Sequence, residues 1–362
     1  MLLREPDLAK VFVSVLIDTY NHERFIEQAI TSVLEQDFPS SDREVIVVDD
    51  GSTDGTAEIV RKFAPQVRLI RKLNGGQGSA FNTGIPECQG EVTAFLDGDD
   101  WWHGNKLSLV IPRMAADPSV GMVGHSFVET FPGGEEKIVA LGHEARFRLN
   151  SVKNAEAFRL CRCYLGTSRL AMRTAIARAA LTVPEELSFE ADEYIFTVAA
   201  TLADVLILND PLCHYRIHGG NLFITSEATP DGTRKKQKVL AALGMSLSTE
   251  LTRLGTPAEV RRCVLEIIEA EEAQLRLMLD GGTGWETYRT ENLLYRVQHA
   301  DASWTHRLFR YATMIPAIFL PPVWFYKARR WIGNQSWYRR ARKKILPAPE
   351  FSKIPVGKAG DE

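Results

Sequence analysis

The first hundred residues alternate short apolar runs with stretches of helical periodicity. Residues 11–17 form a β-branched-rich run broken only by Ser14, which is typical of a strand buried on both faces in a parallel sheet. Apolar residues at i, i+4 spacing follow in residues 25–34 and predict a helix that packs on this strand. Further strands are predicted at residues 44–48, 67–70 and 92–96. The alternation predicts right-handed βαβ units in an α/β fold with a mostly parallel sheet flanked by helices.

Composition narrows the classes of protein. The chain has 362 residues with 26 Gly, 17 Pro and five Cys, which excludes collagen-like, disulfide-scaffold and disordered classes. Residues 1–10 lack the apolar core of a secretory signal. An odd number of cysteines without a CxxC pair predicts reduced thiols and no zinc site, and hence a cytoplasmic location.

Three of the predicted strands end in acidic residues. The first runs into Asp18, the second into Asp49 and Asp50, and the last into Asp97-Gly-Asp-Asp100. Ligands of open α/β sheets bind at the carboxyl ends of strands, and carboxylates gathered there repel one another unless a cation or a hydrogen-bonding ligand joins them. Because Mg²⁺ or Mn²⁺ suits such oxygen ligands together with substrate phosphates, the pattern predicts a metal–diphosphate site.

A glycine-rich loop, Asn74-Gly-Gly-Gln-Gly78, follows the third predicted strand and leads into a helical pattern. Such a loop can approach a ligand closely or seat a phosphate at a helix N-terminus. Its spacing fits neither GxGxxG nor GxxxxGK[ST], which excludes a Rossmann dinucleotide site and a P-loop.

Four segments together resemble the family 2 glycosyltransferases of the GT-A fold, in order and in spacing. They are residues 13–21 (VSVLIDTYN), 47–56 (VVDDGSTDGT), 74–84 (NGGQGSAFNTG) and 95–101 (FLDGDDW). The resemblance covers residues 11–220. It implies a GT-A-type sheet with a C-terminal helical extension, and an inverting, metal-dependent transfer of a sugar from a nucleoside diphosphate, with UDP expected, to a hydroxyl acceptor.

The resemblance also implies roles for individual residues. Asp97 would face the ribose and the metal, Asp99 would bind Mg²⁺ or Mn²⁺ directly, and Asp50 would hydrogen-bond the base. The remaining nucleotide-binding candidates are Thr19, Tyr20, Asn21, Glu23 and Gly76. The diphosphate and sugar candidates are Asn82, Arg216 and Asp100. Many family members carry Arg before the Asn of the third motif, whereas this chain has Phe81, so no contact through that Arg is carried over.

A catalytic base is expected in residues 189–196 (FEADEYIF). The family usually has a Glu-Asp pair here, and the alignment of the following apolar pair places Asp192 in the base position. Glu190 and Glu193 are reserve candidates, and acids at a helix start also complement the helix dipole. Residues 214–221 (HYRIHGGN) resemble a further family segment, whose His218 would lie near the metal or the diphosphate.

From residue 234 onward the sequence is predominantly helical. In residues 257–279 an apolar stripe predicts core packing, with a homodimer seam as the alternative. The stripe consists of Val260, Val264, Ile267, Ile268, Leu275 and Met278, with Glu271 on the same face. The predicted divisions of the chain are 1–110 and 111–225 for the two halves of the GT-A domain, 226–300, 301–346 and a flexible tail at 347–362.

Residues 302–349 contain ten Lys and Arg and no acidic residue. The net charge of −3 therefore divides into +10 on this segment and −13 on the rest of the chain. Four interleaved tryptophans give 301–346 the composition of a membrane-surface segment, which predicts peripheral contact with the inner face of a membrane and a glycan or lipid-linked acceptor. Docking on the protein's own acidic body is the alternative, and no nucleic-acid partner is expected.

Two other functions remain open from the sequence. A nucleotidyltransferase also uses acidic metal ligands on an α/β sheet, but the basic glycine-rich loop usual near its N-terminus is absent here. A non-catalytic membrane-surface module would contain a degenerate transferase domain, and the intact Asp97/Asp99 pair with Asp192 argues against it.

Overall fold

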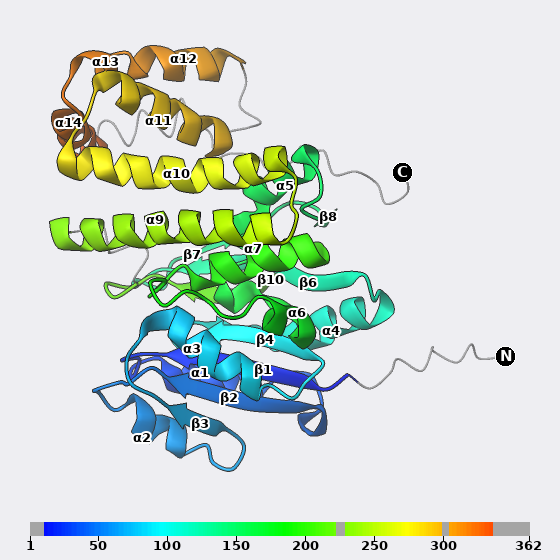
Figure 1. Ribbon diagram of the computed structural model, residues 1–362. Coiled ribbons are helices and arrows are strands. Elements are labelled where there is room, and N and C mark those ends of the chain that lie inside the picture. Colours follow the sequence, from blue (N-terminus) through cyan, green and yellow to red (C-terminus); the bar gives the residue numbers. More distant parts are fainter. Residues whose placement is uncertain (1–10, 222–228, 299–303, 336–362) are drawn as a thin grey trace.

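The structure is a computed structural model that describes residues 11–221, 229–298 and 304–335 (Figure 1). The predicted flexible tail, residues 336–346 of the basic segment and the first ten residues lie outside the described residues. A large sheet with helices on both faces forms one part of the molecule. A layer of long antiparallel helices stacks on it.

The sheet has the strand order β3-β2-β1-β4-β9-β6-β10-β5, with β7 paired to β6 and β8 paired to β10. The strands are β1 (Val13–Thr19), β2 (Arg43–Asp49), β3 (Arg68–Arg71), β4 (Val92–Asp97), β5 (Trp101–Trp102), β6 (Val120–Thr130), β7 (Glu136–Val139), β8 (Ala145–Phe147), β9 (Ala171–Arg173) and β10 (Asp204–Arg216). Strands β3, β2, β1 and β4 are parallel, as are β6 and β10, whereas β9 runs antiparallel between the two groups. The predicted α/β class with a mostly parallel sheet is confirmed.

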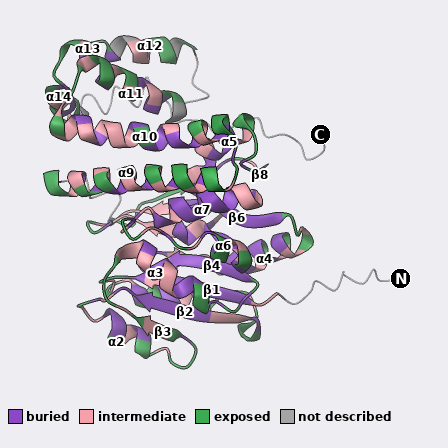
Figure 2. Ribbon diagram, viewed as in Figure 1, coloured by how far each residue is buried: buried purple, intermediate pink, exposed green. Residues whose placement is uncertain are grey.

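The helices of the sheet domain cover both of its faces. They are α1 (Ile26–Leu34), α2 (Thr56–Arg61), α3 (Gly76–Gly84), α4 (Lys106–Ala116), α5 (Val152–Cys161), α6 (Thr174–Ala179) and α7 (Ala191–Leu202). The central strands are buried almost throughout (Figure 2), because helices exclude water from both sides. Helix α2 begins at Thr56, whose backbone N–H donates to Asp54 Oδ1 at 3.0 Å.

The helical region begins after the sheet and runs to the end of the described residues. Its helices are α9 (Pro230–Arg253), α10 (Ala258–Asp280), α11 (Gly284–Gln298), α12 (Trp304–Met314), α13 (Pro316–Phe319) and α14 (Pro322–Asn334). This confirms the predicted C-terminal helical region. Among the helices that the structure describes, none has both the length and the hydropathy needed to cross a bilayer.

The apolar stripe of α10 packs into the core of this chain. Val260, Val264, Ile267, Ile268 and Leu275 are buried in the same cluster as the sheet residues. The stripe is therefore not an exposed dimer seam. Glu271, which interrupts it, receives a hydrogen bond from Arg162 Nη2 at 2.5 Å and so joins the helical layer to the sheet domain.

Candidate active site

Four aspartates gather where β1 and β4 end. Asp18 and Asp97 are register partners on these adjacent parallel strands, and the turn after β4 adds Asp99 and Asp100. Burial raises the pKa of Asp18 and of Asp97 well above the usual value, and repulsion from neighbouring carboxylates raises both further. Burial also raises the pKa of Asp100, to about 7. Burial and mutual repulsion therefore disfavour the charged forms of these three carboxyls while no ligand is bound.

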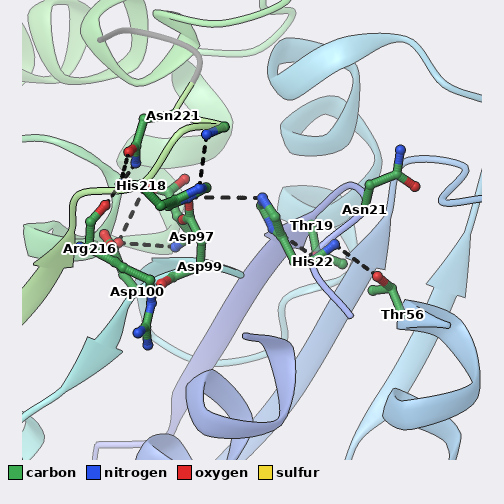
Figure 3. A network of polar contacts seen from close by, with 12 residues as sticks. Thr19, Asn21, His22, Thr56, Asp97, Asp99, Asp100, Arg216, His218 and Asn221 are labelled. Atoms are coloured by element: carbon green, nitrogen blue, oxygen red, sulfur yellow. Dashed lines mark hydrogen bonds and ion pairs between the residues drawn. The ribbon is translucent and has the colours of Figure 1, made fainter. Parts of the chain in front are cut away.

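Asp99 faces two histidines that come from distant parts of the chain (Figure 3). His218 Nε2 lies 2.9 Å from Asp99 Oδ2, and His22 Nε2 lies 3.9 Å from the same oxygen. Although burial raises the pKa of Asp99, the hydrogen bond from His218 and the charge of His22 hold it below the usual value. Asp99 is thus the aspartate of the cluster that is kept ionised.

Gly98 allows the turn after β4 to lie against the loop after β1. A Cβ atom at this position would come within 2.5 Å of Thr19 Oγ1 and 2.9 Å of His22 Nδ1. A side chain here would push the two loops apart, since contacts this short do not occur between real atoms. The glycine therefore brings His22 within reach of Asp99.

The loop that carries His218 is fixed by Arg216. Its backbone N–H donates to Asp100 Oδ1 at 2.8 Å, and its Nε donates to the Asp99 carbonyl oxygen at 2.8 Å. Its guanidinium group also lies over the rings of Phe25 and Trp101. The predicted contact of Arg216 with a departing diphosphate remains a proposal, and the contacts in the structure hold the His218 loop against the aspartate turn.

Asp192 lies at the start of α7, across from the aspartates. Its Oδ2 accepts hydrogen bonds from Thr167 N at 3.0 Å and Thr167 Oγ1 at 3.2 Å, and its Oδ1 accepts from Glu193 N at 2.9 Å. After burial, the charge of Asp192 is the largest cause of the raised pKa of Asp18, which places it close to the cluster. The structure therefore brings Asp192 into the same site as Asp97 and Asp99.

Gln77 joins the two sides of this site. Its Nε2 donates to Thr167 Oγ1 at 3.1 Å and lies 3.4 Å from Asp97 Oδ1, while its Oε1 accepts from Ala191 N at 3.1 Å. One carboxamide thus connects a carboxylate at the end of β4, the residue that holds Asp192, and the first turn of α7. A shift of α3 would move all three together.

The two reserve candidates for the base have different surroundings. Glu193 forms an ion pair with Arg162 at 2.7 Å, and burial raises its pKa to about 7. Glu190 adopts a left-handed backbone with φ of 61° just before α7, a conformation that is costly for a residue with a side chain. Arg162 ties Glu193 to the helical layer, whereas Glu190 sets the direction in which α7 begins.

The predicted nucleotide-binding residues after β1 lie in a loop that is bonded to the loop after β2. Asn21 Oδ1 accepts from Thr53 N at 2.8 Å, and Glu23 Oε2 accepts from Gly55 N at 2.8 Å. Thr19 Oγ1 lies 3.2 Å from His22 Nδ1. The ring of Tyr20 is 42% exposed at this edge, so an aromatic face is available to a planar base.

Asp50 and Gly76 lie together at the start of α3. Asp50 accepts hydrogen bonds from Gly76 N at 2.6 Å and from Lys72 Nζ at 2.6 Å. Gly76 has φ of +82°, and a Cβ atom there would come within 2.5 Å of Ser188 Cα. In the structure, Asp50 therefore anchors the glycine-rich loop.

Asn82 makes a paired contact with the main chain of Val183. Its Nδ2 donates to the carbonyl oxygen and its Oδ1 accepts from the backbone N–H, both at 2.8 Å. The predicted contact of Asn82 with the diphosphate or the sugar stays a prediction. Here the side chain joins α3 to the segment that leads into α7.

Three residues of this site were absent from the predicted set: Asp18, His22 and Gln77. Asp18 was recognised as a strand-end acid, and its burial beside Asp97 follows only from the strand register. His22 depends on the close approach at Gly98, which the sequence alone does not show. For Gln77 the available signal was its place inside the Gly-Gly-Gln-Gly loop.

The donor set fits a divalent cation that also binds phosphate. Asp18 Oδ1 and Asp100 Oδ2 are buried and have no hydrogen-bond partner among the described residues. Within the same part of the chain, no three His, Cys, Asp or Glu side chains are arranged to hold an ion by themselves. Mg²⁺ and ions like it are commonly bound by one or two carboxylates together with substrate phosphates, so Asp99, with His218 beside it, would hold the metal together with a diphosphate.

Comparisons with known proteins identify the family of the chain. Residues 14–178 match the family described as Glycosyl transferase family 2. The chain is 32% identical over 259 residues to the uncharacterized glycosyltransferase alr2836 of Nostoc, and the match covers 68% of this chain and 78% of that protein. It is also 38% identical over 98 residues to the poly(ribitol-phosphate) beta-N-acetylglucosaminyltransferase TarS of Staphylococcus aureus, covering 26% of this chain and 17% of that protein.

A solved structure shares the fold. The mannosyltransferase PcManGT from Pyrobaculum calidifontis, in complex with GDP-Man and Mn²⁺, superposes with a TM-score of 0.52 at 20% identity. The superposition covers 94% of this chain and 89% of that one. The match therefore extends over both the sheet and the helical region.

Proposed function

The chain belongs to glycosyltransferase family 2, an inverting family. From this we propose that it transfers a sugar from a UDP-sugar donor to a hydroxyl acceptor with the help of Mg²⁺ or Mn²⁺. The observation that carries the proposal is the convergence of Asp97, Asp99 and His218 on one side of the site with Asp192 on the other. Binding of a nucleotide-sugar donor requires the side with Asp97, Asp99 and His218. Activation of an attacking hydroxyl requires Asp192.

The donor would lie along the carboxyl ends of β1, β2 and β4. Tyr20 offers a face for the base, and Asp97 would meet the ribose. A divalent cation bound at Asp99 would neutralise the charge that develops on the departing nucleoside diphosphate. His218 fixes the direction of the Asp99 carboxylate, and Arg216 fixes the loop that carries His218.

Asp192 is the proposed catalytic base. Thr167 and the backbone N–H of Glu193 donate to its two oxygens, which fixes the direction of the carboxylate. The carboxylate would take the proton of the acceptor hydroxyl as that oxygen attacks the sugar from the face opposite the leaving group. One base without a protein nucleophile gives inversion in a single displacement, with oxocarbenium character at the sugar.

Two parts of the proposal differ among the relatives: the nucleobase of the donor and the sugar that is transferred. The name of TarS specifies N-acetylglucosamine transfer, and PcManGT was solved with GDP-Man. A glycan or lipid-linked acceptor and membrane contact through residues 301–346 also belong to the proposal.

A donor screen tests the proposed function. The full chain is incubated with UDP- and GDP-sugars and, in separate reactions, with nucleoside triphosphates and sugar phosphates, with and without Mn²⁺. The released products are identified by mass spectrometry, and nucleotide binding is measured by calorimetric titration. We expect release of a nucleoside diphosphate only when metal is present. Release of pyrophosphate from a nucleoside triphosphate would instead indicate a nucleotidyltransferase, and the absence of both turnover and nucleotide binding would favour a non-catalytic module.

A further inference from the structure

Helices α12 and α13 present an apolar stripe to solvent. Trp304, Leu308, Ile315 and Phe319 are 71%, 54%, 48% and 79% exposed. Their spacing, with half-buried Tyr311 between them, places them on one face of a helix. Ile315, between the two helices, keeps helical backbone angles, so the stripe runs through both. Large exposed apolar side chains gathered in this way mark an interaction surface.

Helix α14 exposes its tryptophans in the same way. Trp324 and Trp331, two turns apart, are 68% and 65% exposed. On the opposite side, Phe325 and Tyr326 are buried against Leu277 of α10 in a small core that also includes Met314 and Ala317. The helix is therefore held in place by one set of aromatics while a second set remains outside.

The basic side chains of this segment divide into two groups. Arg310 and Arg329 form ion pairs with the buried Glu291 of α11 and hold the helices together. Arg307, Lys327 and Arg330 are exposed beside the tryptophans. The first group follows the predicted alternative of docking on the protein's own acidic residues. We call the exposed set the aromatic–basic surface: Trp304, Leu308, Ile315, Phe319, Trp324 and Trp331 with Arg307, Lys327 and Arg330.

The α14 part of the aromatic–basic surface lies at the same end of the helical layer as the active-site loop. Helix α9 begins nine residues after Asn221, and Arg234 in its second turn pairs with Asp280 at the end of α10 at 2.6 Å. Gly281 follows, and a Cβ atom there would lie 4.0 Å from Val323 of α14. Figure 1 shows α14 on the side of the molecule to which the carboxyl ends of β1 and β4 point.

We propose that the aromatic–basic surface binds the headgroup region of an anionic bilayer and turns the active-site edge toward it, so that the acceptor is a hydroxyl carried by a membrane lipid. Tryptophans favour the boundary between headgroups and acyl chains, and Lys and Arg are attracted to anionic lipids. The absence of acidic residues from 302 to 349 leaves no carboxylate in the segment to oppose that attraction. The part concerning the acceptor rests on the proposed glycosyl transfer, whereas the membrane contact does not.

Vesicle flotation of the full chain, without nucleotide, tests the contact. Vesicles of phosphatidylcholine alone are compared with vesicles containing 30% phosphatidylglycerol. We expect binding to the anionic vesicles that weakens as salt is raised. The double variant Trp324→Ala/Trp331→Ala and the double variant Lys327→Glu/Arg330→Glu should each lower the bound fraction about fivefold or more.

Matched controls carry the same kinds of change on other elements. Met245→Ala alters an exposed apolar residue of α9, and Lys62→Glu alters an exposed cation at the C-terminal cap of α2. Both should bind within about twofold of the unchanged chain. Failure of the unchanged chain to float, or equal loss in the controls, would overturn the proposal. A dimer in sedimentation that the tryptophan variant abolishes, without vesicle binding, would assign the surface to a second copy of the chain and overturn it as well.

Donor turnover is measured separately, without vesicles, so that the two failures are distinct. A chain that floats but does not release nucleoside diphosphate would refute the glycosyl transfer and leave the membrane contact standing. A chain that turns over donor but does not float would refute the membrane contact and leave the glycosyl transfer standing. For the acceptor, a lipid extract incorporated into vesicles should accept labelled sugar with the unchanged chain and about fivefold less with the tryptophan variant, and equal labelling by both would contradict the orienting role.

Discussion

His218 Nε2 lies 2.9 Å from Asp99 Oδ2, although 119 residues separate the two in the chain. The contact depends on the sheet, because β10 carries the histidine loop to the turn that follows β4. The contact favours the ionised form of Asp99 and fixes the direction of its carboxylate. If the pair acts on a metal ion, disturbing the histidine should change metal affinity before it changes the fold.

We expect His218→Asn to weaken binding of Mn²⁺ in the presence of UDP by about 10-fold or more, since partners that orient a ligating carboxylate typically contribute that much. Calorimetric titration of metal into the protein with saturating UDP measures the effect. His143→Asn, in the segment between β7 and β8, serves as the matched control and should bind as the unchanged chain does. Equal affinity in the two variants would remove His218 from the metal site.

Gln77 offers a test of how the donor and acceptor sides are aligned. Gln77→Leu removes the contacts to Thr167 and Ala191, and we expect kcat to fall about 10- to 100-fold with a smaller change in KM for the donor, because small misplacements at a reacting centre are costly. Gln77→Glu places a further carboxylate beside Asp97 and should weaken donor binding as well. Gln89→Leu, at an exposed position, is the control. A kcat for Gln77→Leu equal to that of the control would contradict the aligning role.

Lys106, a buried residue of α4, provides a test of the pH dependence of stability. It is fully buried, donates to the Ser168 carbonyl oxygen at 2.8 Å, and burial lowers its pKa to about 7. Between about pH 7 and pH 10 the unfolded chain therefore binds a proton that the folded chain does not, so stability should rise with pH across this window.

Lys106→Met should remove that contribution to the pH dependence of the free energy of unfolding. Urea unfolding at several pH values from 7 to 10 gives the free energy of unfolding for both proteins, and the difference between them should change with pH. A constant difference over this window would mean that Lys106 keeps its ordinary pKa inside the protein.

Much of the fold could be predicted because local patterns determine it. The run from Val13 and the acids after β2 and β4 mark the strands and their ends, and βαβ connections fix the sheet around them. Strands β6, β7 and β8 were not predicted, nor were β5 and β9, since Trp101–Trp102 and Ala171–Arg173 are too short to show a period. Their places in the sheet depend on long-range pairing.

The site could be predicted only in part, for a related reason. Asp97, Asp99 and Asp192 stand in recognisable motifs, so their types and order point to the chemistry. The contact of His22 with the site depends on the missing side chain at Gly98, and the role of Gln77 depends on where α7 begins. Such contacts arise between segments that come together only in the folded chain, and a motif on one segment does not reveal them.

The most direct test of the central claim is the rate of sugar transfer by Asp192→Asn under single-turnover conditions, with donor binding measured in parallel. The substitution keeps the shape of the side chain and can still accept from Thr167 N. We expect the rate to fall by about 10²- to 10⁴-fold, the usual contribution of a general base, while the donor dissociation constant changes by less than about threefold. Transfer by Asp192→Asn within about threefold of the unchanged enzyme would contradict the assignment of Asp192 as the base.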